Sequence, residues 1–225
     1  MNYKQQLYYK QKQVYDAFTR IGKLNFPDIM PIIGSEKIYN YRNKMEYAFS
    51  SKMWLTEEQI KSPEDFKNRN ALGFHLPGMF DKILDIKQCH LQQEPGNEIR
   101  NFVREYCEKH NYTFFDNRVQ YGLMRSLIIR NSSIGEWMVI VMFHQDDRGK
   151  RENLLNAISD NFPQISSLMY IINPKRNDSY GDLDVHLFKG KDHMIEEMEG
   201  LKFKVGPKSF YQTNSLQAYQ LYKKS

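Results

Sequence analysis

Residues 123–144, LMRSLIIRNSSIGEWMVIVMFH, decide the fold because they predict the β-hairpin around which the other elements assemble. The two arms, 123–131 and 136–144, are joined through Asn131–Gly135, a polar stretch that is typical of a turn. The second arm contains WMVIVMF, which is almost entirely apolar. A strand that is apolar on both faces belongs in the interior of a sheet, so we expect this arm to be central.

Outward from the hairpin, apolar spacing predicts strands and helices in mixed order. Further strands are expected at 37–50, 72–76, 83–86, 166–173, 183–187 and 201–206. Helices are expected at 3–21, 97–110, 149–161 and 216–224. Strands occur both in adjacent pairs and singly between helices. This order favours an α+β fold, with a mixed or antiparallel sheet and flanking helices, over a doubly wound parallel sheet.

The composition is that of an ordinary globular protein. The chain has 225 residues, of which 40% are apolar and 26% charged, so a mostly disordered chain is not expected. Two cysteines are too few for a disulfide scaffold. No apolar run is long enough to span a bilayer, and the N-terminus is polar. We therefore expect a soluble cytoplasmic protein without a membrane partner or an obligate protein partner.

The charge is distributed unevenly along the chain. Residues 1–52 and 201–225 each carry a net charge of +5, whereas residues 53–200 carry −5. Basic ends can form the electrostatic footprint of a polyanion-binding protein. The alternative is that these charges only cover solvated faces.

Several kinds of chemistry are missing from the sequence. It has no GxG motif and no P-loop, so it does not contain a complete nucleotide-cofactor domain of either type. Cys89 and Cys107 are far apart, and no CxxC is present, so no metal site is complete. The six histidines are scattered, and spacing alone shows no catalytic constellation.

Two segments carry residues suited to binding. In residues 39–46, YNYRNKME, aromatic side chains alternate with Arg42 and Lys44; cations can pair with phosphates while aromatics stack on unpaired bases. The alternative is an edge strand protected by charge. Residues 207–214, PKSFYQTN, form an acid-free turn that offers amides and the ring of Phe210. The alternative there is an ordinary helix cap formed by Asn214.

These segments also carry a resemblance to a known family. Five stretches occur in the order found in the RNA (uracil-5-)-methyltransferases that modify 23S ribosomal RNA or transfer RNA. They are YKQKQV (9–14) with RIG (20–22), YRNK (41–44), LGFH (72–75) with PG (77–78), DI (85–86) with Cys89 and LQ (91–92), and SFYQTN (209–214). Each stretch alone is weak, but five in order over nearly the whole chain make a specific match.

The resemblance implies that the chain is an excerpt of a longer enzyme. Residues 1–200 resemble the central RNA-substrate-recognition domain, and residues 201–225 resemble the start of the catalytic domain. The Rossmann-like part of that domain is then absent, with the nucleophile and base beyond residue 225. The implied function is RNA recognition, and part of the donor and base pocket, for an S-adenosylmethionine-dependent 23S ribosomal RNA (uracil-5-)-methyltransferase. The chain alone is then expected to be inactive.

The resemblance also implies roles for single residues. Gln212 matches a glutamine that contacts S-adenosylmethionine, and Phe210 is expected near the flipped base and RNA. Cys89 matches the fourth ligand of the family's iron–sulfur cluster; the other three would precede residue 1, so no cluster is expected in this chain. The RNA-facing candidates, in addition to Phe210, are Arg42, Asn43, Lys44 and His75.

Three alternatives remain open at this point. The chain can be a stand-alone RNA-binding module, a relative of the transfer RNA (uracil-5-)-methyltransferases, or an α+β interaction domain that does not bind RNA. The LGFH and cysteine-bearing stretches favour ribosomal RNA as the partner.

Overall fold

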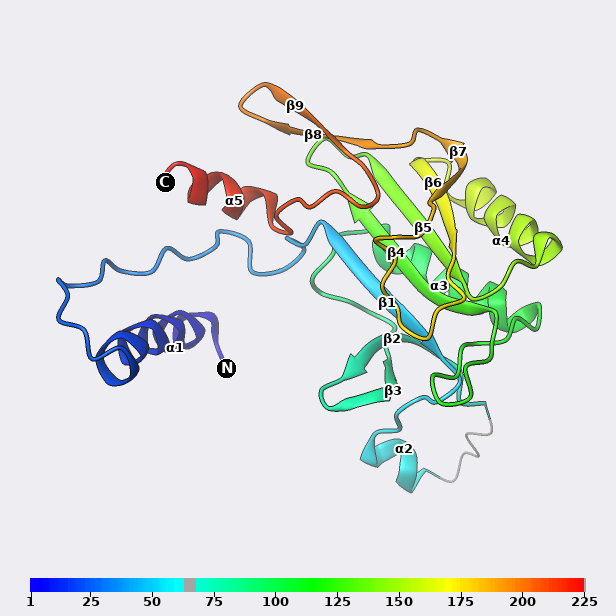
Figure 1. Ribbon diagram of the computed structural model, residues 1–225, viewed down its shortest axis with the longest axis horizontal. Coiled ribbons are helices and arrows are strands. Elements are labelled where there is room, and N and C mark those ends of the chain that lie inside the picture. The colour runs from blue at the N-terminus through cyan, green and yellow to red at the C-terminus, as the bar shows by residue number, and fades with distance from the viewer. Residues whose placement is uncertain (63–67, 225) are drawn as a thin grey trace. The chain divides into compact units, whose positions relative to one another are not determined.

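The structure, a computed structural model, describes residues 1–62 and 68–224 (Figure 1). The chain divides into two compact units, Met1–Tyr39 and Asn40–Ser225. This division lies far from the domain boundary near residue 200 that the sequence suggests. The boundary near residue 200 stays a prediction. In the described part of the chain, no helix is long and apolar enough to cross a membrane.

The first unit is built on the expected N-terminal helix. Helix α1 covers Tyr3–Asp16 and continues as a π-helical turn, η1, over Ala17–Ile21. The Asn2 side chain caps α1 by accepting a hydrogen bond from the Gln5 backbone N–H at 2.9 Å. The Phe26 ring, from the segment that follows, contacts the rings of Tyr15 and Phe18. The apolar face of the helix therefore has its own downstream segment as a neighbour.

The second unit contains a seven-stranded sheet in the order β3-β2-β1-β4-β5-β6-β7. The strands are β1 (Lys44–Ser50), β2 (Ala71–Leu76), β3 (Met79–Asp85), β4 (Met124–Asn131), β5 (Trp137–Phe143), β6 (Ile165–Ile172) and β7 (His186–Gly190). Only β5 and β6 pair in parallel; the other neighbours are antiparallel. The predicted hairpin is β4–β5, and β5 is buried at every position. The mixed sheet confirms the α+β prediction.

Two helices cover one face of this sheet. Helix α3 (Gly96–Lys109) lies behind the strands in Figure 1, and helix α4 (Arg148–Asn161) is drawn to the right of β6. Their apolar side chains form one core cluster with residues from β1, β4 and β5. Successive side chains of a strand point to opposite faces, so alternate residues of these strands contribute to the cluster. Members of this cluster that are fully buried include Ile99, Val103, Leu155, Leu127 and Val139.

The opposite face is covered in part by a second hairpin. Strands β8 (Met194–Met198) and β9 (Leu201–Val205) form a separate two-stranded sheet. Met194 and Val205 pack in a cluster with Ile128, Ile140 and Met169 of the large sheet. Helix α5 (Ser215–Tyr222) follows, and the Asn214 side chain caps it by accepting from the Gln217 backbone N–H at 3.0 Å. This cap agrees with the sequence prediction.

Some predicted boundaries are wrong. The strand expected at 37–50 begins only at Lys44, because Asn40 has a positive φ of 53° and the preceding backbone pairs with loops. The N–H of Arg42 donates to the carbonyl of Leu91 at 2.8 Å. The strand expected at 183–187 lies at His186–Gly190, and α2 (Glu57–Lys61) and β8 were not predicted.

Candidate functional site

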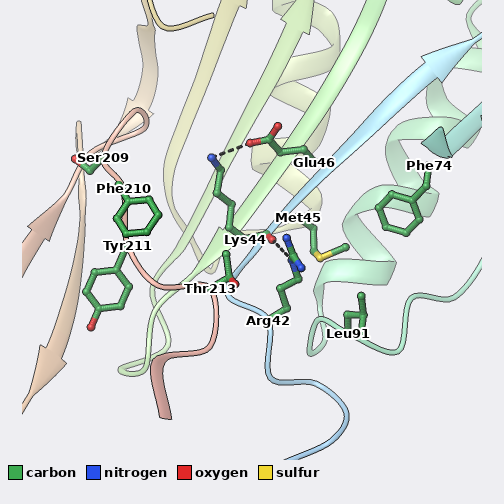
Figure 2. Close-up of a pocket in the computed structure, with 10 residues that line it drawn as sticks. All are labelled: Arg42, Lys44, Met45, Glu46, Phe74, Leu91, Ser209, Phe210, Tyr211 and Thr213. Atoms are coloured by element: carbon green, nitrogen blue, oxygen red, sulfur yellow. Dashed lines mark hydrogen bonds and ion pairs between the residues drawn. The ribbon is translucent and has the colours of Figure 1, made fainter. Parts of the chain in front are cut away.

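A pocket of about 610 Å³ lies where the chain enters β1 (Figure 2). Arg42, Lys44 and Glu46 contribute from the chain at the start of β1, and Ser209, Phe210, Tyr211 and Thr213 contribute from the segment after β9. Met45, Phe74 and Leu91 supply apolar lining. The two segments that the sequence marked separately thus form one site, and Phe210 faces Lys44 across its opening in Figure 2.

Asn43 holds the later segment against β1. Its backbone N–H donates to the Thr213 carbonyl at 2.8 Å, and its side-chain Nδ2 donates to the Gln212 carbonyl at 2.9 Å and to Ser215 Oγ at 2.8 Å. Asn43 is only 3% exposed. Its amide therefore acts within the protein, positioning residues 212–215 beside the pocket.

Arg130 holds the same segment from the next strand. It lies opposite Lys44 in the β1–β4 register and is 1% exposed. Its Nη1 donates to the carbonyls of Gly206 at 2.8 Å, Ser209 at 3.2 Å and Pro207 at 3.3 Å. Burial lowers the pKa of the Arg130 guanidinium from its usual value, but arginine remains charged near neutral pH. Arg130 is not among the residues predicted from the sequence, although an arginine inside an apolar strand is a usable signal.

Lys44 forms a polar cluster with Glu46 and Tyr180. Lys44 Nζ lies 2.7 Å from Glu46 Oε1 and donates to the Tyr180 hydroxyl at 3.2 Å, and that hydroxyl donates to Glu46 Oε1 at 3.3 Å. Partial burial lowers the pKa of Lys44, but the contacts with Glu46 and Tyr180 outweigh it and leave that pKa raised. Lys44 is therefore a positive charge throughout the neutral range.

The other RNA-facing candidates differ in their surroundings. Arg42 is half-buried, and its Nε donates to the Lys44 carbonyl at 3.0 Å. Phe210 is 85% exposed as a residue and lies beside the pocket. His75 is exposed on β2, opposite Ile83, and is not part of the pocket lining.

The two residues expected to serve cofactors also have defined places. Gln212 is half-buried, and its carbonyl accepts the hydrogen bond from Asn43. Cys89 is 5% exposed and is bracketed by Asn97, which accepts from its N–H at 2.6 Å and donates to its carbonyl at 3.2 Å. Across residues 1–62 and 68–224, no group of three or more His, Cys, Asp or Glu is placed to hold a metal ion, so an iron–sulfur cluster has no support here.

The arrangement suits a ligand that is anionic and has flat rings. Arg42 and Lys44 bring positive charge to the pocket, and Lys208 adds an exposed amine next to Ser209. Glu46 is the acidic residue of the lining. Cations that face solvent can bind phosphate oxygens, and an exposed aromatic ring can stack on an unpaired base.

Comparison with known proteins finds relatives that are named as RNA methyltransferases. The chain is 56% identical over 224 residues to a protein of Bacteroides thetaiotaomicron named as an uncharacterized RNA methyltransferase. It is 54% identical over 226 residues to a protein of the same description from Porphyromonas gingivalis. Each alignment covers 98% of this chain and 49% of the relative. The chain is therefore a homologue of proteins named RNA methyltransferases and spans about half of their length.

The fold comparison gives a solved structure with the same architecture. The crystal structure of the Pyrococcus abyssi tRNA (uracil-54, C5)-methyltransferase in complex with S-adenosyl-L-homocysteine matches with a TM-score of 0.71. The match covers all of this chain and 47% of that protein, at 23% sequence identity. At this identity the likeness establishes the shared fold. No protein-family model matches the chain.

Proposed function

We propose that the second unit recognises RNA for an S-adenosylmethionine-dependent RNA (uracil-5-)-methyltransferase. The observation that carries the proposal is the pocket at the start of β1, where Arg42, Lys44 and the exposed ring of Phe210 meet. The homology to proteins named RNA methyltransferases supports the class of substrate.

The pocket favours unpaired RNA over a duplex. The Phe210 ring can contribute binding energy only if it lies against the face of a base, and such faces are accessible in loops and single strands. Stacking of a base on an aromatic side chain contributes roughly 1–3 kcal/mol. Arg42 then binds a neighbouring phosphate without regard to sequence, and Lys44 adds a second positive charge to the same pocket.

We propose that this chain supplies only a small part of the binding site for the methyl donor. Gln212 is the candidate contact, and Asn43 fixes its backbone. The sequence lacks the GxG turn that lets a backbone approach a nucleotide cofactor closely, so the 225 residues do not by themselves fit the adenosyl group. We assign the nucleophile and the base to residues outside this sequence and derive no methyl-transfer step from it.

The target within RNA is part of the proposal. The stretches at 72–75 and 85–92 favour a uridine of 23S ribosomal RNA as the target, with carbon 5 as the methylated atom. Transfer RNA is the second candidate, because the solved structure that shares the fold is named as a tRNA (uracil-54, C5)-methyltransferase. Competition between a ribosomal hairpin and a transfer RNA for this chain separates the two.

RNA binding by the chain should be weak and strongly dependent on salt. We expect the logarithm of the association constant for a uridine-rich single strand to fall linearly with the logarithm of salt concentration, with a slope of about −0.7 for each phosphate neutralised. Two or three contacts from the pocket give a slope of about −1.4 to −2.1. Fluorescence anisotropy with labelled RNA between low and moderate salt measures it. Absence of binding at the lowest salt would favour the interaction domain that does not bind RNA.

A further inference from the structure

We propose that Lys44 and Glu46 read the Watson–Crick edge of one unpaired guanine in the bound RNA. The inference rests on the proposed function and adds a base preference to it. Both side chains line the pocket, two residues apart on β1, so they lie on the same face of the strand. A carboxylate repels phosphate, so phosphate binding does not account for the position of Glu46 in the lining.

The geometry leaves part of this pair available to a ligand. The Glu46 side chain is 50% exposed and that of Lys44 is 26% exposed. The contacts of Glu46 with Lys44 and with Tyr180 both use Oε1. Neither contact uses Oε2, so this oxygen can accept from a ligand while the pair stays intact.

The donors and acceptors of the pair match guanine. An ionised carboxylate only accepts hydrogen bonds, and an ammonium only donates them. Guanine presents the O6 acceptor beside two adjacent donors, N1–H and the N2 amino group. Lys44 Nζ can donate to O6 while Glu46 Oε2 accepts from one of the two donors, and Oε1 accepts from the other in place of the Tyr180 hydroxyl. Each group of the pair thus meets a complementary group of the base.

The other bases fit this pair less well. Uracil offers one N–H between two carbonyl oxygens, so one of them meets a carboxylate oxygen. Adenine and cytosine each place an acceptor nitrogen beside their amino group, which leaves the same mismatch. A good bidentate contact discriminates between bases by roughly 1–3 kcal/mol, so we expect a preference for guanine of about tenfold.

The pocket also offers room and a surface for the ring. Its volume of about 610 Å³ lies within the usual range for small-ligand sites. Phe210 and Tyr211 contribute aromatic rings to the lining (Figure 2). A base held by its edge on β1 can therefore have its face covered by the segment that Asn43 and Arg130 fix in place.

The test uses three short RNAs that differ at one position. Each is a uridine-rich single strand with guanine, inosine or adenine at its centre; inosine lacks the N2 amino group. We expect the chain to bind the guanine strand about tenfold tighter than the adenine strand, with inosine in between. Glu46→Gln should remove the preference, because an amide cannot accept two hydrogen bonds side by side. Glu105→Gln, an exposed position on α3, removes the same charge and should keep the preference.

The outcomes separate this inference from the function on which it rests. Equal affinity of the unmodified chain for the three RNAs would overturn the guanine reading and leave RNA recognition standing. A guanine preference that survives in Glu46→Gln would place base reading elsewhere and would also overturn it. If none of the RNAs binds, the proposed function fails and the inference fails with it. A thermal melt of Glu46→Gln confirms that the variant is folded, and the first outcome does not depend on any variant.

Discussion

Replacing Arg130 by methionine should lower the free energy of unfolding by about 2–3 kcal/mol, because methionine fills similar space but donates no hydrogen bond. The carbonyls of Gly206, Pro207 and Ser209 then lose a charged donor in a buried setting. Hydrogen bonds to charged groups contribute roughly 1.5–3 kcal/mol each, and removal of the buried cation's own desolvation cost offsets part of the loss. Urea unfolding followed by circular dichroism measures the change.

The matched control is Arg148→Met on α4. Its side chain is 80% exposed and pairs with Glu152, whose side chain is 43% exposed. An exposed ion pair contributes at most about 1 kcal/mol, so this variant should remain near the unmodified stability. In Arg130→Met, hydrogen exchange should also accelerate in residues 206–215. An unchanged urea midpoint with unchanged exchange would mean that Arg130 does not hold this segment.

The second large effect is expected on RNA affinity. The double variant Arg42→Ala with Lys44→Ala should bind uridine-rich RNA at least thirtyfold more weakly, a loss of about 2 kcal/mol. The loss is large because Glu46 stays behind, so the three charged side chains of the pocket change from a net charge of +1 to −1. Fluorescence anisotropy at low salt measures the affinity, and the slope against salt should become shallower.

Two further variants show whether position or total charge matters. Lys87→Ala with Lys109→Ala removes two exposed cations outside the pocket and should weaken binding only slightly. Adding Glu46→Ala to the pocket double variant should recover part of the affinity, because the uncompensated carboxylate is gone. Equal losses in the two double variants would indicate diffuse attraction by the net charge of the chain.

The elements that the sequence predicted correctly are those with a strong local signal. The β4–β5 hairpin is marked by its nearly continuous apolar arm, and helices α3 and α4 are marked by apolar residues at helical spacing. Strand β8 is not predicted from the sequence, because a charged residue interrupts its apolar pattern. Glu196, which is fully buried, occupies one of its inward positions. Its carboxylate accepts from the Ser133 N–H at 2.8 Å and from Ser215 Oγ at 3.2 Å, partners that no local pattern can reveal.

The sequence predicts several residues of the candidate site, but it does not predict how they are arranged in space. The sequence singled out Arg42, Lys44 and Phe210, and the fold places all three at one pocket. Asn43 was expected to face RNA, yet its amide is used inside the protein on a segment about 170 residues away in sequence. Arg130 depends on the register between β1 and β4, which only the folded sheet defines.

The measurement that tests the central claim most directly is a crosslink from position 210. The photoreactive residue p-benzoylphenylalanine replaces Phe210, a position that is 85% exposed and should tolerate the change. The same residue at Phe80, which is 66% exposed on β3 and outside the pocket lining, is the control. We predict a crosslink to uridine-rich RNA from position 210 that unlabelled RNA competes away, and little from position 80. No crosslink from position 210, or equal crosslinking from both positions, would contradict RNA recognition at this pocket.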